Sequence, residues 1–242
     1  MSTPTAAQAS DLPVNIGFVV YPGFQALDVF GPLDPLNMLS MEVPLKLSII
    51  GPTLEPVSTK APPVVPTVSP DFAQSIVPTH TFASPPKDLD VLIVPGGAGL
   101  MYPVELQQAQ IDFVKEQYPK LKYLISVCAG ASLLARAGVL DGKRATTTKA
   151  GWAWTTSTGP NVNWVPKARW VVDGNIWTTS GVVAGIDGIF AWISHVYGED
   201  LSLKIANTFE FERHTDASYD PFADVWNVST SVAAQASTGQ SA

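Results

Sequence analysis

Residues 124–134 read LISVCAGASLL, and this stretch decides how the rest of the chain is interpreted. The apolar run Tyr123–Val127 is typical of a strand buried on both faces. Cys128 follows at once, and small residues then lead into a helix that we expect over residues 130–137. A side chain between a strand and a helix is exposed at the carboxyl end of a sheet. The stretch therefore predicts a nucleophile elbow with Cys128 at its tip.

Cys128 is the only cysteine of the chain. The amino terminus of the following helix offers free N–H groups and a positive dipole end, and both favour a thiolate. The alternative is a thiol packed as a small core hydrophobe, which is common for free cysteines. The elbow context favours a functional thiol over a packed one.

Strands and helices alternate along most of the chain. We expect further buried strands at residues 14–20, 45–50 and 90–94, and a hairpin of strands near 168–173 and 176–179. Helices are expected at 32–40, 104–117, 149–157, 181–198 and 200–211, whereas the Pro-rich residues 52–88 read as an irregular excursion with short edge strands. This pattern indicates an α/β fold with a mainly parallel sheet covered by helices on both faces. Such folds bind ligands beyond the carboxyl ends of their strands.

The length of the chain allows one large α/β domain or two small ones. Hydrophobic residues make up 46% of the 242 residues, the net charge is −7, and no basic cluster is longer than Lys143-Arg144. Nucleic-acid binding is therefore not expected, because it needs a basic face. No stretch approaches the roughly 18 apolar residues of a membrane helix, and residues 1–13 do not resemble a secretory signal. We expect a cytoplasmic protein with a flexible segment 1–12, one domain over 13–228 and a disordered tail 229–242.

The thiol needs a proton partner, and the histidines are poor candidates. None of the three stands at a predicted strand end: His80, His195 and His214. The chain also lacks the spacing of a zinc site, so no metal is expected. Asp28, in the sequence ALDVFGP, is more suggestive, because apolar surroundings raise the pKa of a carboxyl group toward neutrality. We expect it in the loop before a helix that begins at Pro32; the alternative role is a helix cap.

Three further features bear on the site. The sequence PGG at residues 95–97 also follows a strand, so its N–H groups could bind negative charge in the same crevice. It is not a phosphate loop, since no Gly-Lys-Ser/Thr follows. Asp34 reads as an exposed helix residue, and Asp187, inside an apolar helix, needs a partner and reads as structural.

Four motifs give the chain a family resemblance: IGFVVYPGFQALDVFGPLD, DVLIVPGGAG, LISVCAGASLLARAGVLDGKRATTT and IWTTSGVVAGIDGIFAWI. They resemble the ThiJ/PfpI superfamily, which is related to class I glutamine amidotransferase domains, and within it the isocyanide (isonitrile) hydratases. The resemblance implies a flavodoxin-like α/β/α sandwich, a homodimer, and neither a metal nor an organic cofactor. It also implies that Cys128 is the nucleophile, that Asp28 is the acid/base group, and that the N–H groups of Gly97 and Ala129 lie near the thiol.

The chain departs from this pattern at two positions. Ala129 stands where the hydratases have a threonine, and Thr148 stands where many relatives have the histidine of ATTHW. The missing histidine argues against a protease, glyoxalase or deglycase with a Cys–His pair. It argues less against a hydratase, which relies on the aspartate. The chain also ends in a short polar tail where regulator relatives carry a helix-turn-helix module, so a regulator is not expected.

The leading hypothesis is a lyase that adds water to an isocyanide, R–NC, to give an N-substituted formamide through a Cys128 thioimidate. A second hypothesis is another Cys-dependent lyase or hydrolase of the same superfamily. A third is a non-enzymatic sensor of oxidative stress, whose thiol is oxidised to a sulfinate.

Overall fold

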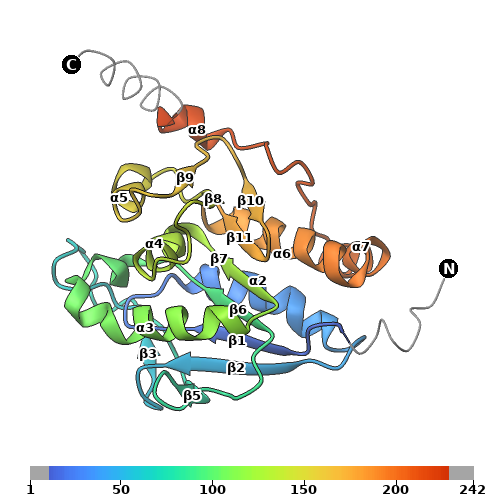
Figure 1. Cartoon of the computed structure of the whole chain (residues 1–242), viewed down its shortest axis with the longest axis horizontal. Helices are drawn as coiled ribbons and strands as arrows, with labels where there is room; N and C mark the ends of the chain where they lie inside the picture. Colours follow the sequence, from blue (N-terminus) through green and yellow to red (C-terminus); the bar gives the residue numbers. More distant parts are fainter. Residues whose placement is uncertain (1–10, 229–242) are drawn as a thin grey trace.

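The computed structural model describes residues 11–228. They form a seven-stranded sheet with helices packed around it (Figure 1). The strand order is β10-β11-β7-β6-β1-β2-β5. The strands are β1 (Asn15–Val19), β2 (Lys46–Gly51), β5 (His80–Thr81), β6 (Val91–Val94), β7 (Tyr123–Ser126), β10 (Trp170–Asp173) and β11 (Ile176–Thr179). All neighbours are parallel except the β10–β11 hairpin, so the predicted mainly parallel sheet is confirmed. The predicted tail 229–242 and residues 1–10 of the predicted flexible segment lie outside the described range.

Helices cover the sheet in two groups. Helices α2 (Ala26–Leu39), α6 (Val182–Tyr197) and α7 (Glu199–Thr208) pack on one another, whereas α3 (Gln108–Gln117) packs on α4 (Ala131–Arg136). The chain moves from β1 to β2 in one direction along the sheet and from β6 to β7 in the other. Right-handed crossovers then place α2 and α3 on opposite faces. The fold is the expected flavodoxin-like α/β/α sandwich.

Short elements complete the described chain. Residues 52–88 are irregular, as expected, apart from β5 and the pair β3 (Val57–Ser58) and β4 (Ser75–Ile76). A second small pair joins β8 (Arg144–Ala145) to β9 (Asn163–Trp164), and the remaining helices are α5 (Trp152–Ser157) and α8 (Phe222–Val225). Single turns of 3-10 helix are η1 (Ala98–Met101), η2 (Val104–Gln107), η3 (Tyr118–Lys120) and η4 (Cys128–Gly130). Between residues 11 and 228, no helix is long and apolar enough to cross a bilayer.

The expected start of the first helix, at Pro32, is wrong. Helix α2 begins at Ala26, so Asp28 lies in its first turn and not in a loop, and Pro32 and Pro35 lie inside the helix. Each proline removes one backbone hydrogen bond. Tertiary packing outweighs this loss: a Cβ on Gly31 would lie 2.9 Å from a side-chain carbon of Ile186, so α2 and α6 pack closely.

The change of direction between β1 and β6 creates a crevice at the carboxyl ends of the strands. Three segments leave the sheet there: the start of α2 after β1, residues 95–97 after β6, and the Cys128 turn after β7. The topology thus brings together residues that are about a hundred positions apart.

Candidate active site

Cys128 occupies a sharp turn directly after β7. Its φ is 55°, in the left-handed region that side chains other than glycine rarely adopt. Two hydrogen bonds hold the turn: the Cys128 N–H donates to Ser180 O at 2.9 Å, and the Thr147 hydroxyl donates to Cys128 O at 2.8 Å. The predicted nucleophile elbow is therefore present.

The Asp28 carboxyl group is fully buried next to this thiol. Its Oδ2 accepts the N–H of Gly96 at 2.9 Å. Within residues 11–228, Oδ1 has no backbone or hydroxyl donor, and the remaining interaction of the carboxylate is with the Cys128 thiol. Burial raises the pKa of Asp28 from 3.8 to about 7, more than the two hydrogen bonds lower it. The expected raised pKa is thus found.

The sequence predicted a lowered pKa for the Cys128 thiol, and the structure raises it. Burial, and next the negative charge of Asp28, raise the pKa of Cys128 to about 12. The Thr148 hydroxyl and the Ala129 N–H both donate to the sulfur and act in the opposite direction, but they do not outweigh burial. At neutral pH the resting thiol therefore keeps its proton and donates it to the Asp28 carboxylate.

Residues 95–97 lie directly against the elbow. A Cβ on Gly96 would be 2.7 Å from Ala129 N and 2.9 Å from Asp28 Oδ2, so only glycine fits there. Gly97 adopts φ 141°, and its N–H has no acceptor in the described part of the chain. The structure thus brings Gly96 and Ala129 against Asp28 and Cys128, whereas Gly97 packs against the backbone of residues 23–25.

Sequence reasoning missed two neighbours of this pair. Thr148, noted only for replacing a histidine, donates to the sulfur. Tyr21, at the end of β1, is fully buried, donates to Pro95 O at 2.7 Å, and has its pKa raised by burial and by the charges of Asp28 and Cys128. The only signal for Tyr21 in the sequence was its position just after an apolar strand.

The other candidates lie elsewhere. His80 is in β5, the ring of His195 packs edge-on against Tyr123, and His214 Nδ1 lies 3.3 Å from Asp187 Oδ2. Asp187 is structural, as expected, since Arg169 Nε donates to it at 2.7 Å. Asp34 is exposed. In the part of the chain that the structure describes, no group of three or more His, Cys, Asp or Glu residues could hold a metal ion.

This combination of fold and elbow agrees with a family of known proteins. Residues 14–194 match the sequence profile of the DJ-1/PfpI family. The chain belongs to this family. An isonitrile hydratase of Pseudomonas putida is 34% identical over 201 residues, which are 83% of this chain and 79% of that protein. The HTH-type transcriptional regulator GbdR of Pseudomonas aeruginosa is 31% identical over 125 residues, which are 52% of this chain and 33% of the regulator.

Solved structures of DJ-1/PfpI proteins share the fold. A ThiJ/PfpI family protein from Pseudomonas syringae superposes with a TM-score of 0.70 at 24% identity, covering 97% of this chain and 93% of that one. Such identity supports the architecture, while the chemistry of this chain has to be argued from its own site.

Proposed function

We propose that this DJ-1/PfpI protein is a lyase that hydrates isocyanides, R–NC, to N-substituted formamides. The observation that carries the proposal is the pairing of Asp28 with Cys128, in which a buried carboxylate of pKa about 7 accepts the thiol proton. Such a pair can deprotonate the nucleophile and keep the proton for the substrate. The similarity over most of its length to an isonitrile hydratase supports the same reaction.

In the first half of the reaction, Asp28 takes the proton of Cys128 as the sulfur attacks the isocyanide carbon. That carbon gains a carbon–sulfur bond, and Asp28 returns the proton to it. The result is a thioimidate, Cys128–S–CH=N–R, with no change in oxidation state. The Thr148 hydroxyl and the Ala129 N–H stabilise the sulfur while it carries negative charge.

In the second half, the Asp28 carboxylate takes a proton from a water molecule. At the same time the oxygen of that water adds to the thioimidate carbon. The proton passes to the substrate nitrogen and gives Cys128–S–CH(OH)–NH–R. Cleavage of the carbon–sulfur bond then releases the formamide, and the hydroxyl proton restores the thiol. In this proposal the N–H of Gly97, which has no acceptor among residues 11–228, stabilises negative charge during these steps.

The raised pKa of Cys128 bears on the sensor alternative. Oxidation of cysteine proceeds from the thiolate, so a thiol with a pKa of about 12 is a slow target. No histidine contacts Cys128 among the described residues, which disfavours a Cys–His hydrolase. A hydratase that uses Asp28 needs neither a reactive resting thiolate nor a histidine.

The test is direct turnover. Purified protein is incubated with cyclohexyl isocyanide, and N-cyclohexylformamide is followed by NMR. We expect turnover by the wild-type protein and none by Cys128→Ala, with both proteins showing the same circular dichroism. Wild-type rates in Cys128→Ala would eliminate the proposed mechanism.

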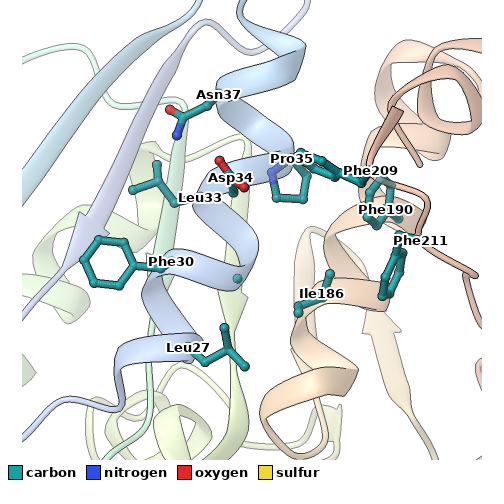
Figure 2. A pocket seen from close by; sticks show the side chains of 11 residues that line it. Leu27, Phe30, Leu33, Asp34, Pro35, Asn37, Ile186, Phe190, Phe209 and Phe211 are labelled. Carbon is teal, nitrogen blue, oxygen red and sulfur yellow. The ribbon is translucent and has the colours of Figure 1, made fainter. Parts of the chain in front are cut away.

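We also propose that the protein is a cytoplasmic homodimer. A groove lined by apolar side chains of α2, α6 and the segment after α7 opens on the surface (Figure 2), with Leu27 and Phe30 each about two-fifths exposed. Exposed apolar patches of this kind mark interaction surfaces. Light scattering is expected to give twice the mass of 25.8 kDa, and Phe30→Glu is expected to lower it to that of a monomer.

A further inference from the structure

A pocket of about 490 Å³ lies beside the elbow. It opens between the amino terminus of α6 and the carboxyl-terminal segment that includes α8. Its lining includes Thr148, Ser180, Val182, Val183, Phe222 and Trp226. Of these residues, only Thr148 takes part in the proposed reaction. The other lining residues have no role in it.

Two lining residues connect the pocket to Cys128. Thr148 lines the pocket and also donates a hydrogen bond to the Cys128 sulfur. Ser180, another lining residue, accepts the Cys128 N–H at 2.9 Å. A Cβ on Gly185 would lie 2.5 Å from the side chain of Val127, so the first turn of α6 packs directly on the residue before Cys128. The pocket is therefore next to the Cys128 turn, while Cys128 and Asp28 themselves are not part of its lining.

The charged groups in the pocket wall are already paired. Lys149 lies 3.3 Å from Asp220 and donates to Thr146 Oγ1 and Thr147 O at 2.8 and 2.9 Å, all within buried surroundings. Arg169 is held by Asp187. Buried ions that are satisfied in this way offer little to a charged ligand. What remains for a ligand is the apolar surface of Val183, Phe222 and Trp226, together with the stacked rings of His214 and Tyr219.

The outer wall lies outside the part of the chain that matches the family profile, which ends at residue 194. Asp220 fixes this wall to the domain, because its Oδ2 accepts the Ser180 hydroxyl at 2.7 Å and pairs with Lys149. Ala217 O accepts the N–H of Arg169 at 2.7 Å. Both contacts lie before Phe222 in the chain, so they fix the beginning of the wall to the domain.

We propose that this pocket binds the apolar substituent R of the substrate, and that the protein therefore prefers aromatic or branched isocyanides to methyl isocyanide. The assignment rests on the proposed function, since it places R beside the carbon that Cys128 attacks. Pockets lined by apolar side chains, with few polar groups near the reacting atom, are the usual binding sites for such substituents.

The test compares two substrates in variants of one wall residue. Val183 is 51% exposed, so Val183→Trp has room to fold while it fills the pocket. We expect the ratio of kcat/KM for benzyl isocyanide to that for methyl isocyanide to fall at least tenfold in Val183→Trp. Leu203→Trp, on α7 and 44% exposed, is the matched control and should keep the wild-type ratio. An unchanged ratio in Val183→Trp overturns the proposal.

A binding measurement separates this proposal from the hydratase activity. N-benzylformamide and N-methylformamide are titrated by NMR into the full chain. We expect tighter binding of the benzyl compound to the wild-type protein, and its loss in Val183→Trp, whether or not any isocyanide is turned over. If neither compound binds the wild type, or if both bind equally, the pocket assignment is wrong. Should Val183→Trp not fold, Trp226→Ala serves instead, with an expected loss of at least threefold in benzyl binding.

Discussion

The Asp28 carboxylate and the Cys128 thiol interact across the crevice, from the first turn of α2 and the turn after β7. The charge of Asp28 raises the free-energy cost of ionising the thiol, whereas the hydrogen bond from the thiol favours the charged form of Asp28. Above a pH of about 7 the pair therefore holds one proton, which lies on the sulfur, and the carboxylate is the base next to it. This arrangement places a base in contact with the nucleophile without a histidine.

The first prediction concerns Asp28→Asn. An amide cannot accept the thiol proton, so kcat for isocyanide hydration should fall at least a hundredfold, within the usual range for general acid–base catalysis. The measurement is steady-state formamide formation. A loss of less than threefold would assign the proton transfer to another group.

The same variant should be more stable than the wild type at pH 8. Burial raises the folded-state pKa of Asp28 from 3.8 to about 7, so the folded protein binds this proton more tightly than the unfolded chain. Stability is therefore lost as the pH rises between these values, by on the order of 4 kcal/mol at most. Urea unfolding at pH 8 should give the Asp28→Asn variant the larger free energy of unfolding, and the difference should shrink toward pH 4.

The third prediction is a pH dependence. The active form of the pair holds one proton in total, so kcat/KM should rise as Asp28 ionises near pH 7 and then stay level through pH 9. Asp28→Asn should lack this rise in its residual rate. A wild-type rate that falls between pH 6 and 8 would mean that the reaction needs the doubly protonated pair.

The fourth prediction concerns Thr148→Val. The substitution removes a donor from the sulfur and keeps the volume, so kcat/KM should fall about tenfold, the effect of one hydrogen bond to a charged group. Alkylation of Cys128 by iodoacetamide should also become slower at a given pH. Thr148→Ser should restore both rates; a failure of Ser to do so would make the role of Thr148 one of packing.

The fifth prediction concerns Gly96→Ala. Its Cβ would lie 2.7 Å from Ala129 N and 2.9 Å from Asp28 Oδ2, so the loop and the elbow must separate. We expect a loss of about 2 kcal/mol in the free energy of unfolding, typical of overpacking, and a loss of most activity. Gly181→Ala, whose Cβ would meet nothing within 4 Å, is the control for stability. Equal stability of the two variants would contradict the close approach of loop and elbow.

The elbow could be predicted because its signal is local. An apolar run followed by Cys128 and small residues is sufficient to predict a strand that ends in a sharp turn before a helix. The raised pKa of Asp28 was predicted from its apolar sequence neighbours, but Leu27 and Phe30 are each about two-fifths exposed. The carboxyl group is instead buried against the distant residues Gly96 and Cys128.

The remaining features depend on contacts between distant segments. Pro32 is a good helix start by itself, and only the packing of Gly31 against Ile186 explains a helix that runs through it. The helix end beside Cys128 predicted an acidic thiol, but burial and Asp28 outweigh that effect. Asp220 joins the wall at Phe222 and Trp226 to Ser180, which bonds the backbone of Cys128, and no pattern in the sequence links Asp220 to Cys128.

The left-handed conformation of Cys128 has a consequence for the evolution of this chain. A side chain at φ 55° costs on the order of 1 kcal/mol relative to glycine, and Cys128 also carries a buried thiol next to a carboxylate. Glycine at this position would remove both costs and give a protein that is more stable but catalytically inactive. Selection for thermal stability alone would therefore replace the cysteine. In a library of variants selected only for resistance to heat, glycine should accumulate at position 128, whereas selection for turnover as well should retain Cys128.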